Sequence, residues 1–445
     1  MLSKNVSRRR FNAILAAAGV TAGTATVSLP TLHKVAAAAA QDGEVAIEYW
    51  HRSGGDAATK WEELAAAFSE EFAGKIKVTA VAQGGISELN QKVRTAAAGG
   101  GMPGALMADD SDVNQYAANE LIVDIDPYIA DPENGLTQDV IDSFLPNQYN
   151  RHKLAIYNDQ RMAFPQAFSA AAMFCNLDAL EAAGFDGPPA TWQEFPDHAR
   201  AILAANPAMV PFAFLDAGAK FITFLKTYGV EWIKDDQQTA NFDTPEALEI
   251  MTLWKELSDE GLMQIFTENA VDVIASGQCV YLMDSSAAAR GIAVAEPTFN
   301  WSGGLPPQGA ADGELRTETY GPINTLPATS EAEQLAGWTW LKWLATPEPL
   351  AQWVAQTSYF PSIPATAEEP TLAEFYTNYP VAKEMIETVA PYATILAPHA
   401  ALTEVRSTIT PNNVNEVLLG RLTPEEGMQK LQQEANEAIA RAAGA

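Results

Sequence analysis

The feature that most constrains the fold is an alternation of short apolar runs with longer amphipathic segments. Three runs have the length of strands and cover residues 45–50, 76–81 and 105–108. The segments between them, 58–72 and 87–98, carry apolar residues at helical spacing, and Ser87 is the expected N-cap of the second. This order predicts a parallel or mostly parallel sheet, with ligand groups gathered where its strands end. The third run ends at Asp109 and Asp110.

The rest of the chain continues the same α/β pattern over a length that suits two domains. About 400 residues follow the first forty, and 47% of all residues are hydrophobic, as in proteins with full cores. Short strands are expected at 171–176 and 279–284. Further helices are expected at 177–183, 192–205, 245–260, 332–345 and 424–443.

The first forty residues have the composition of an export signal. They contain no acidic residue, and Arg8, Arg9 and Arg10 precede an apolar run over 13–27 and a small-residue stretch over 36–40. Paired arginines before such a run are typical of a twin-arginine leader. The run is too short and too rich in small residues for a stable membrane anchor. We therefore expect 1–40 to be removed and the rest to work outside the cytoplasm, in the periplasm or its equivalent, as a soluble chain.

The net charge excludes some classes of partner. The formal charge is −29, and loss of the five basic residues of the leader makes it −34. Such a surface repels nucleic acid and anionic lipid. Cys175 and Cys279 are the two cysteines, and both lie in apolar stretches, which favours two buried thiols, although export would permit a disulfide.

Signatures of catalysis and of cofactors are absent. Gly99, Gly101 and Gly104 match a dinucleotide-binding pattern, but they follow a helix instead of a strand. The histidines do not pair at metal-ligand spacing, so we expect no metal, no cofactor and no enzymatic activity. An exported glycoside or phosphodiester hydrolase is the rival class, and it would need carboxylates that converge in a cleft, for which adjacency in sequence is no sign.

An ordered set of segments resembles a known family along essentially the whole mature chain. The set comprises Ile47–His51, Ile76–Val78, Ala96–Pro103, Pro165, Phe174–Gly184, Pro188–Phe195, Gly277–Cys279, Asp284–Ser286, Gly321 and Ser358–Pro361. It resembles the extracellular solute-binding proteins of ABC importers, the group that includes the maltose-binding proteins. Within that group, Trp50-His51 and the turns at Gly321 and Tyr359 are most similar to binders of glycerol-3-phosphate and glycerophosphodiesters.

The resemblance implies a two-lobed, hinge-joined α/β fold of the type II periplasmic-binding-protein kind, with the ligand between the lobes. It implies a monomer that delivers its ligand to the membrane permease of an ABC importer. We expect lobe 1 to comprise 41–168 and 287–344, and lobe 2 to comprise 169–286 and 345–445. The chain would cross between them near Ser169, Ser285 and Ala345.

The resemblance also carries ligand positions onto this chain, namely Trp50, His51, Asp110, Ser169, Ser286, Gly321, Tyr359 and Arg406. Their chemistry suits a small anion. An arginine can clamp two phosphate oxygens, and Ser286 would cap a helix whose free N–H groups point at the anion. Loss of Arg406 should then weaken a phosphate ligand far more than a neutral sugar.

Two departures weaken the phosphate assignment. A tyrosine of the phosphate binders aligns with Ile86, and their paired tryptophans fall near Leu215 and Gly218, with Asp216 between them. A neutral mono- or oligosaccharide or a polyol is therefore the alternative ligand. A sensory instead of a transport role also stays open.

Overall fold

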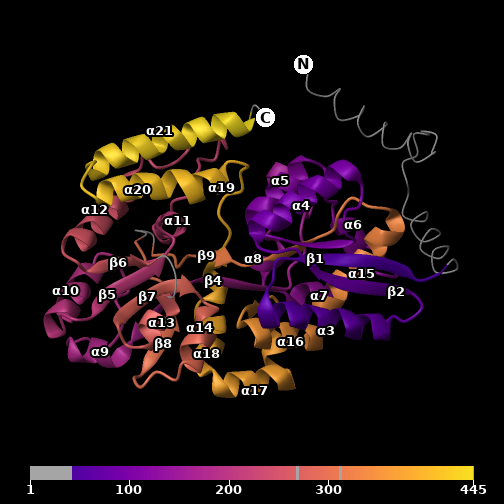
Figure 1. Cartoon of the computed structure of the whole chain (residues 1–445), viewed down its shortest axis with the longest axis horizontal. Coiled ribbons are helices and arrows are strands. Elements are labelled where there is room, and N and C mark those ends of the chain that lie inside the picture. Colours follow the sequence, from indigo (N-terminus) through magenta and orange to yellow (C-terminus); the bar gives the residue numbers. More distant parts are fainter. Residues whose placement is uncertain (1–42, 267–269, 310–312, 444–445) are drawn as a thin grey trace.

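Two β-sheets with their helices divide the chain into two lobes that lie side by side (Figure 1). The computed structural model describes residues 43–266, 270–309 and 313–443. The expected leader, 1–40, lies outside these residues, as does its expected cleavage point. Among the helices described, none is both long and apolar enough to cross a membrane.

The sheet of the first lobe has the predicted parallel core. Its strands are β1 (Val45–His51), β2 (Ile76–Ala82), β3 (Ala105–Ala108) and β10 (Ile323–Thr325), in the order β10-β3-β1-β2. β1 pairs in parallel with β2 and β3, and β10 pairs antiparallel with β3. The parallel pairs follow from the crossover helices between these strands, which return the chain to the same end of the sheet.

Helices cover both faces of this sheet. α3 (Gly55–Glu71) buries Trp61, Leu64, Ala65 and Phe68, the apolar face expected from the sequence, against the sheet together with α15 (Glu331–Leu344) and α16 (Pro347–Thr357). α4 (Ile86–Gly99) and α5 (Asp110–Ala118) cover the other face. The prediction that Ser87 caps α4 is wrong, because the helix begins one residue earlier and Gly85, in extended conformation, is its N-cap.

The second sheet is built around one long buried strand, β4 (Ala167–Asn176). β4 pairs antiparallel with β7, β8, β9 and β11 along its length, and β5 links β7 to β6 in parallel. The bounds are β5 (Val210–Leu215), β6 (Met263–Phe266), β7 (Cys279–Ser285), β8 (Trp301–Gly304), β9 (Thr317–Tyr320), β11 (Phe360–Pro361) and β12 (Ala393–Thr394). Cys175 and Cys279 are free and buried, as expected.

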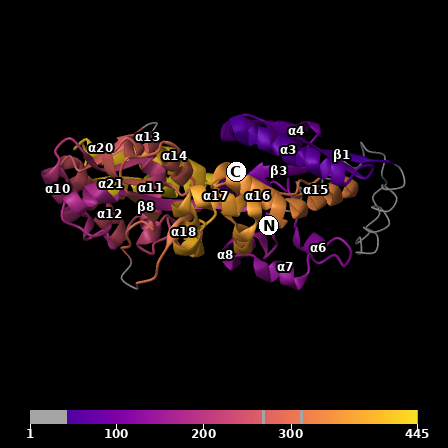
Figure 2. The same cartoon turned by 90° about the horizontal axis from the view of Figure 1, so that it is seen from below.

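The remaining helices complete the two lobes and the region between them. The first lobe also contains α6 (Asp126–Ile129), α7 (Gln138–Ser143) and α8 (Pro146–Tyr149). The second contains α9 (Leu177–Ala182), α10 (Phe195–Ala205), α11 (Ala217–Thr227), α12 (Pro245–Asp259), α13 (Ala270–Ala275), α14 (Ala288–Val294), α20 (Thr410–Leu418) and α21 (Pro424–Ala443). Nearer the boundary are α17 (Pro370–Asn378) and α18 (Pro380–Thr388), which Figure 2 shows between the lobes. α19 (Leu402–Glu404; Figure 1) lies there too and is followed by a π-helical turn over Val405–Ile409.

The chain divides between the lobes differently from the sequence-based expectation. Residues 287–344 were assigned to lobe 1, but β8 and β9 pair with β4 in the second sheet. α16 was assigned to lobe 2, but it packs on α3 of the first lobe. The crossings therefore lie near Ser169, at Gly321 and beside β11, and not at Ser285 or Ala345, because strand pairing and not the order of motifs decides membership of a lobe.

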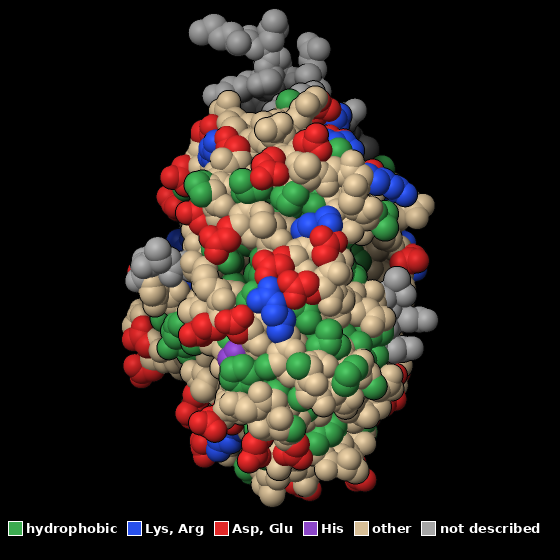
Figure 3. All heavy atoms as spheres, turned by 90° about the vertical axis from the view of Figure 1, so that its left-hand side faces the viewer, with side chains coloured by type: hydrophobic (Ala, Val, Ile, Leu, Met, Phe, Trp, Pro, Cys, Tyr) green, Lys and Arg blue, Asp and Glu red, His purple; other side chains and the backbone are tan. Residues whose placement is uncertain are grey.

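The acidic composition is visible on the surface of the second lobe. Figure 3 shows the end of the molecule where α9 and α10 lie, with acidic side chains spread over the face and fewer basic ones among them. A single basic side chain there is often surrounded by acids, as Arg200 is by Asp197, Glu256 and Glu260. The acidic residues are therefore distributed over this face and do not form one patch.

Candidate functional site

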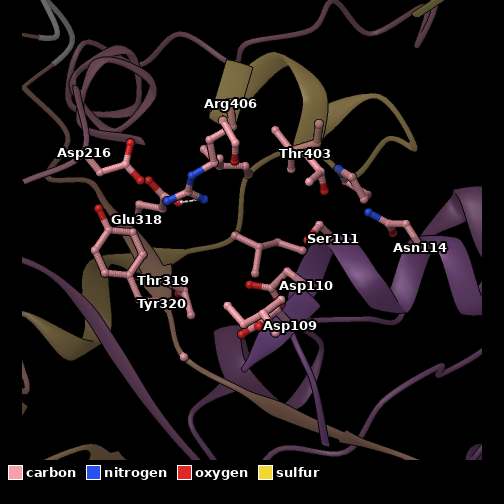
Figure 4. A pocket seen from close by; sticks show the side chains of 17 residues that line it. Asp109, Asp110, Ser111, Asn114, Asp216, Glu318, Thr319, Tyr320, Thr403 and Arg406 are labelled. Atoms are coloured by element: carbon pink, nitrogen blue, oxygen red, sulfur yellow. Dashed lines mark ion pairs between the residues drawn. The ribbon is translucent and has the colours of Figure 1, made fainter. Parts of the chain in front are cut away.

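A cavity of about 320 Å³ lies between the lobes, and both lobes line it. The first lobe contributes the start of α4 and the first turns of α5, with Ile86, Asp109, Asp110, Ser111 and Asn114. The second contributes Asp216, Glu318, Thr319, Tyr320, Leu396, Leu402, Thr403 and Arg406, while Gly321 joins the two walls. Figure 4 shows Asp109, Asp110, Ser111 and Asn114 of the first wall across from Arg406, Glu318 and Tyr320 of the second.

On the first wall, the N-terminus of α5 displays carboxylates at the end of β3. Asp109 is the N-cap of the helix and forms a capping box with Asp112. The guanidinium of Arg52 donates to Asp109 Oδ1 at 2.6 Å, while Asp109 Oδ2 is buried without a partner. Burial, and next the charge of Asp109, raise the pKa of Asp112 to about 6.

Asp110 is held by two side chains from the segment after α8. Arg151 donates from Nε at 2.8 Å and from an Nη at 2.6 Å, and His152 Nε2 lies 2.7 Å from the same carboxylate. Burial alone would raise the pKa of Asp110, but Arg151 and His152 outweigh it and lower the pKa to about 2. Arg151 also donates to the carbonyl oxygen of Gly321 at 2.9 Å, which ties this carboxylate to a lobe crossing.

On the second wall, Arg406 projects from the π-helical turn toward buried Glu318. Its Nη1 lies 2.7 Å from Glu318 Oε1, and its guanidinium carbon lies 5.7 Å from the centre of the Tyr320 ring. The ammonium of Lys220 approaches the same ring and donates to the Tyr320 hydroxyl at 3.3 Å. The second wall therefore presents one aromatic ring flanked by two basic side chains, one of them already paired with a carboxylate.

Asp216 lies beside this group at the N-terminus of α11 (Figure 4). Its backbone is left-handed, with φ of +56°, and its side chain accepts from the N–H of Ala219 at 3.0 Å. Gly218 brings α11 against the π-helical turn, since a Cβ there would lie 2.1 Å from the carbonyl oxygen of Arg406. The close packing at this glycine places Asp216 next to Arg406.

Part of the cavity is apolar. Ile395, Leu396, Pro398 and Leu402 line it from the second lobe, and Ile86, 47% exposed, lines it from the first. The cavity thus combines a carboxylate-rich part with an aliphatic part. Among the described residues, no cluster of histidine, cysteine or acidic side chains could hold a metal ion.

Five of the eight residues expected at the ligand site lie at this cleft or beside it. Asp110, Gly321 and Arg406 line the cavity. Ser169 and Tyr359 contact Gly321, because a Cβ on this glycine would lie 3.3 Å from the backbone nitrogen of Ser169 and 3.5 Å from the Tyr359 ring. Gly321 has φ of +92°, a conformation that favours glycine.

The structure places the other three elsewhere. Ser286 is buried, and its hydroxyl accepts from the N–H of Ala170. It does not cap α14, whose N-cap is Ala287, so the expected anion site at that helix is wrong. The Trp50 indole donates to Glu48, and Trp50 does not line the cavity. His51 is buried beside Tyr49 and Trp61, and burial lowers its pKa to about 4.

Among the lining residues that sequence reasoning did not assign to the ligand are Asp109, Asn114, Glu318 and Tyr320. Asp109 was noticed at the end of its strand but was not assigned to the ligand. Glu318 and Tyr320 stand two residues apart on β9, so they share one face of the strand. That spacing was a signal, but nothing local to the sequence indicated that this face meets Arg406.

Solved structures share this architecture. The cyclic α-maltosyl-1,6-maltose binding protein of Arthrobacter globiformis superposes with a TM-score of 0.75 at 21% identity, over 90% of this chain and 100% of that one. The UgpB protein of Mycobacterium tuberculosis, in complex with glycerophosphocholine, gives a TM-score of 0.72 at 18% identity, over 89% and 98%. At such identities the likeness concerns the fold, which is the predicted two-lobed α/β fold.

A curated relative is similar over a shorter stretch. A binding protein of Brucella abortus is 29% identical over 164 residues, which make up 35% of this chain and 38% of the relative. The match thus spans well under half the length of the curated relatives. The model of the family described as bacterial extracellular solute-binding protein matches residues 63–383, most of the chain. With its two lobes and the cavity between them, this chain belongs to the bacterial extracellular solute-binding protein family.

Proposed function

We propose that this protein captures a neutral, hydroxyl-rich solute, a sugar or a polyol, in the interlobe cleft. It works outside the cytoplasm as a monomer and delivers its ligand to the membrane permease of an ABC importer, without chemical change to the ligand. The sequence favoured glycerol-3-phosphate or a glycerophosphodiester and left the neutral solute as the alternative. The geometry of the cleft favours the alternative.

The observation that carries this choice is the pairing of the arginines at the cleft. Arg52 is paired with Asp109, Arg151 with Asp110 and Arg406 with Glu318. Arg52 and Arg151 do not line the cavity themselves, so their carboxylate partners Asp109 and Asp110 are what the ligand meets on the first wall. On the second wall Glu318 occupies the guanidinium of Arg406, which does line the cavity. An anionic ligand would have to displace these carboxylates, or lie against them, in a chain whose formal charge is already −29.

Two residues that line the cleft have unpartnered polar atoms whose chemistry suits hydroxyl groups instead. Asp109 Oδ2 is a buried acceptor without a partner, and Asn114 Nδ2 is a buried donor without one, its Oδ1 accepting from Tyr157. Both residues line the cavity. Hydroxyl groups can donate to a carboxylate oxygen and accept from an amide, whereas a phosphate oxygen could satisfy only the amide. The Tyr320 ring and the aliphatic side chains can pack against the carbon face of a sugar.

A thermal-shift screen followed by calorimetry tests the proposal, because a ligand of the native state raises the melting temperature. The panel contains maltose, tagatose, glycerol, glycerol-3-phosphate and glycerophosphocholine. We expect shifts with neutral members of the panel and none with glycerol-3-phosphate. Asp110→Asn should weaken the binding of any stabilising sugar, while Asp159→Asn, an exposed position away from the cavity, should not. Stabilisation by the phosphate compounds alone would overturn the choice of ligand.

A further inference from the structure

One carboxylate at the cleft has no cationic partner of its own. Among the described residues Asp216 forms no ion pair, although its charge acts on Arg406. The other carboxylates that line the cavity, Asp109, Asp110 and Glu318, are each paired with an arginine. Asp216 is also exposed, so it is accessible to a solute that enters between the lobes.

The position of this carboxylate is fixed by the backbone. Asp216 has φ of +56°, and its Oδ1 is engaged by the N–H of Ala219, so its second oxygen is left for a ligand. α11 behind it is buried along its whole length. Packing of Gly218 on the carbonyl oxygen of Arg406 keeps the carboxylate and the guanidinium together.

The local charge balance gives Asp216 its effect. Arg406 and Lys220 flank the Tyr320 ring. Glu318 pairs with Arg406 and the charge of Asp284 acts on Lys220, so each of the two basic groups already faces one acid. Asp216 is a further acid beside Arg406, and its negative charge repels an anion that approaches this guanidinium, while its free oxygen can accept from a hydroxyl group.

We infer that Asp216 is the specificity-determining residue of the cleft: it accepts a hydrogen bond from a ligand hydroxyl and excludes solutes that bring phosphate to Arg406. The inference rests on the proposed function for the hydroxyl ligand, but the exclusion of anions can be tested without knowledge of the natural ligand. This role of Asp216 differs from that of an N-cap of α11, because an N-cap that only stabilised the helix would not affect which solute binds.

The test compares the binding of inorganic phosphate and of glycerol-3-phosphate to the full-length protein and to Asp216→Asn. Asparagine keeps the cap and tolerates the left-handed backbone, while it removes the charge and replaces the free acceptor oxygen by an NH2 donor. We expect calorimetry to give at least about fivefold tighter binding of both anions to the variant. Asp159→Asn removes an equal charge from an exposed residue with φ of +59° away from the cavity, and it should leave anion binding unchanged.

The possible outcomes separate this inference from the proposed function. Equal anion affinities for the wild type, Asp216→Asn and Asp159→Asn would overturn the inference, whether or not a sugar binds. Equal gains in both variants would also overturn it, because the effect would then be one of net charge. If no neutral solute bound the wild type, the proposed function would be wrong. The comparison of phosphate binding among the wild type and the two variants would still show whether Asp216 excludes anions.

Discussion

Three aspartates within four residues at the start of α5 are held in three different ways. Asp109 is paired with Arg52, and Asp110 with Arg151 and His152. Asp112 instead accepts from Asn90 Nδ2 at 2.7 Å and from the N–H of Asp109, neither of which is charged. The pKa values diverge accordingly, to about 2 for Asp110 and about 6 for Asp112. Burial acts to raise both pKa values, and for Asp110 the charges and hydrogen bonds of Arg151 and His152 outweigh it, whereas for Asp112 the charge of Asp109 adds to it.

At this scale we predict that Asp112 makes the protein less stable as the pH rises. Its pKa is 3.8 ordinarily and about 6 in the folded chain, so the folded state holds more protons between these values. The stabilisation that Asp112 contributes to the folded state is complete below about pH 4 and is lost as the pH rises to about 6. The unfolding free energy changes by up to about 3 kcal/mol over this range. Asp112→Asn removes this dependence. In urea unfolding from pH 4 to 8, the unfolding free energy of the variant should rise relative to that of the wild type between pH 4 and 6. A difference in unfolding free energy that stays constant with pH would contradict the assigned cause.

Among the elements, the contact between α11 and the π-helical turn organises the second wall of the cleft. A π-helical turn is uncommon and is often found at functional sites, and this one carries Arg406. Gly218 permits the approach, since its missing Cβ would otherwise meet both the Arg406 carbonyl oxygen at 2.1 Å and the Pro411 ring at 2.7 Å. Two elements far apart in the chain thus meet at a point where no side chain can be accommodated.

Gly218→Ala should therefore separate α11 from the turn. We expect a loss of about 2–3 kcal/mol of unfolding free energy from overpacking against backbone, together with weaker binding of any ligand found in the screen. Gly187→Ala is the matched control, because nothing lies within 4 Å of its Cβ position. Denaturant unfolding and calorimetry measure the two effects. Equal stability of the two variants would show that the turn adjusts freely.

For the whole molecule, the crossings between the lobes converge on Gly321. The backbone of Ser169, the Tyr359 ring and the guanidinium of Arg151 all contact this residue or its carbonyl oxygen. The hydrophobic core also continues across the boundary, since α16 packs on α3 and also contacts β4. Hinge closure around a ligand, the motion expected of two lobes that share a site, would rotate the chain about this group.

Gly321→Ala should lower the unfolding free energy by more than the same substitution does at an ordinary glycine with positive φ. The left-handed strain accounts for about 1–2 kcal/mol, and contact with Ser169 and Tyr359 adds to it. Gly420→Ala, at φ of +69° with nothing within 4 Å of the Cβ position, carries the strain alone and serves as the control. We expect a larger fall in unfolding free energy for Gly321→Ala, and a change in radius of gyration by X-ray scattering for that variant only. Equal effects would mean that Gly321 is no more than a turn.

The sequence by itself determined the α/β class and most element positions, which follow from periodicities that neighbouring residues carry locally. The resemblance to the solute-binding family is what grouped Asp110, Gly321 and Arg406, and the apolar stretches around Cys175 and Cys279 favoured buried thiols but did not decide whether they bond. Only the tertiary structure decided that β8 and β9 join β4, that Ser286 bonds to Ala170 instead of capping a helix, and that Glu318 neutralises Arg406. Those outcomes depend on contacts between strands and helices that are distant in the chain. The ion-pair partner of a charged side chain sets what the cleft can bind, but the residues next to that side chain in the sequence do not indicate which partner it will have.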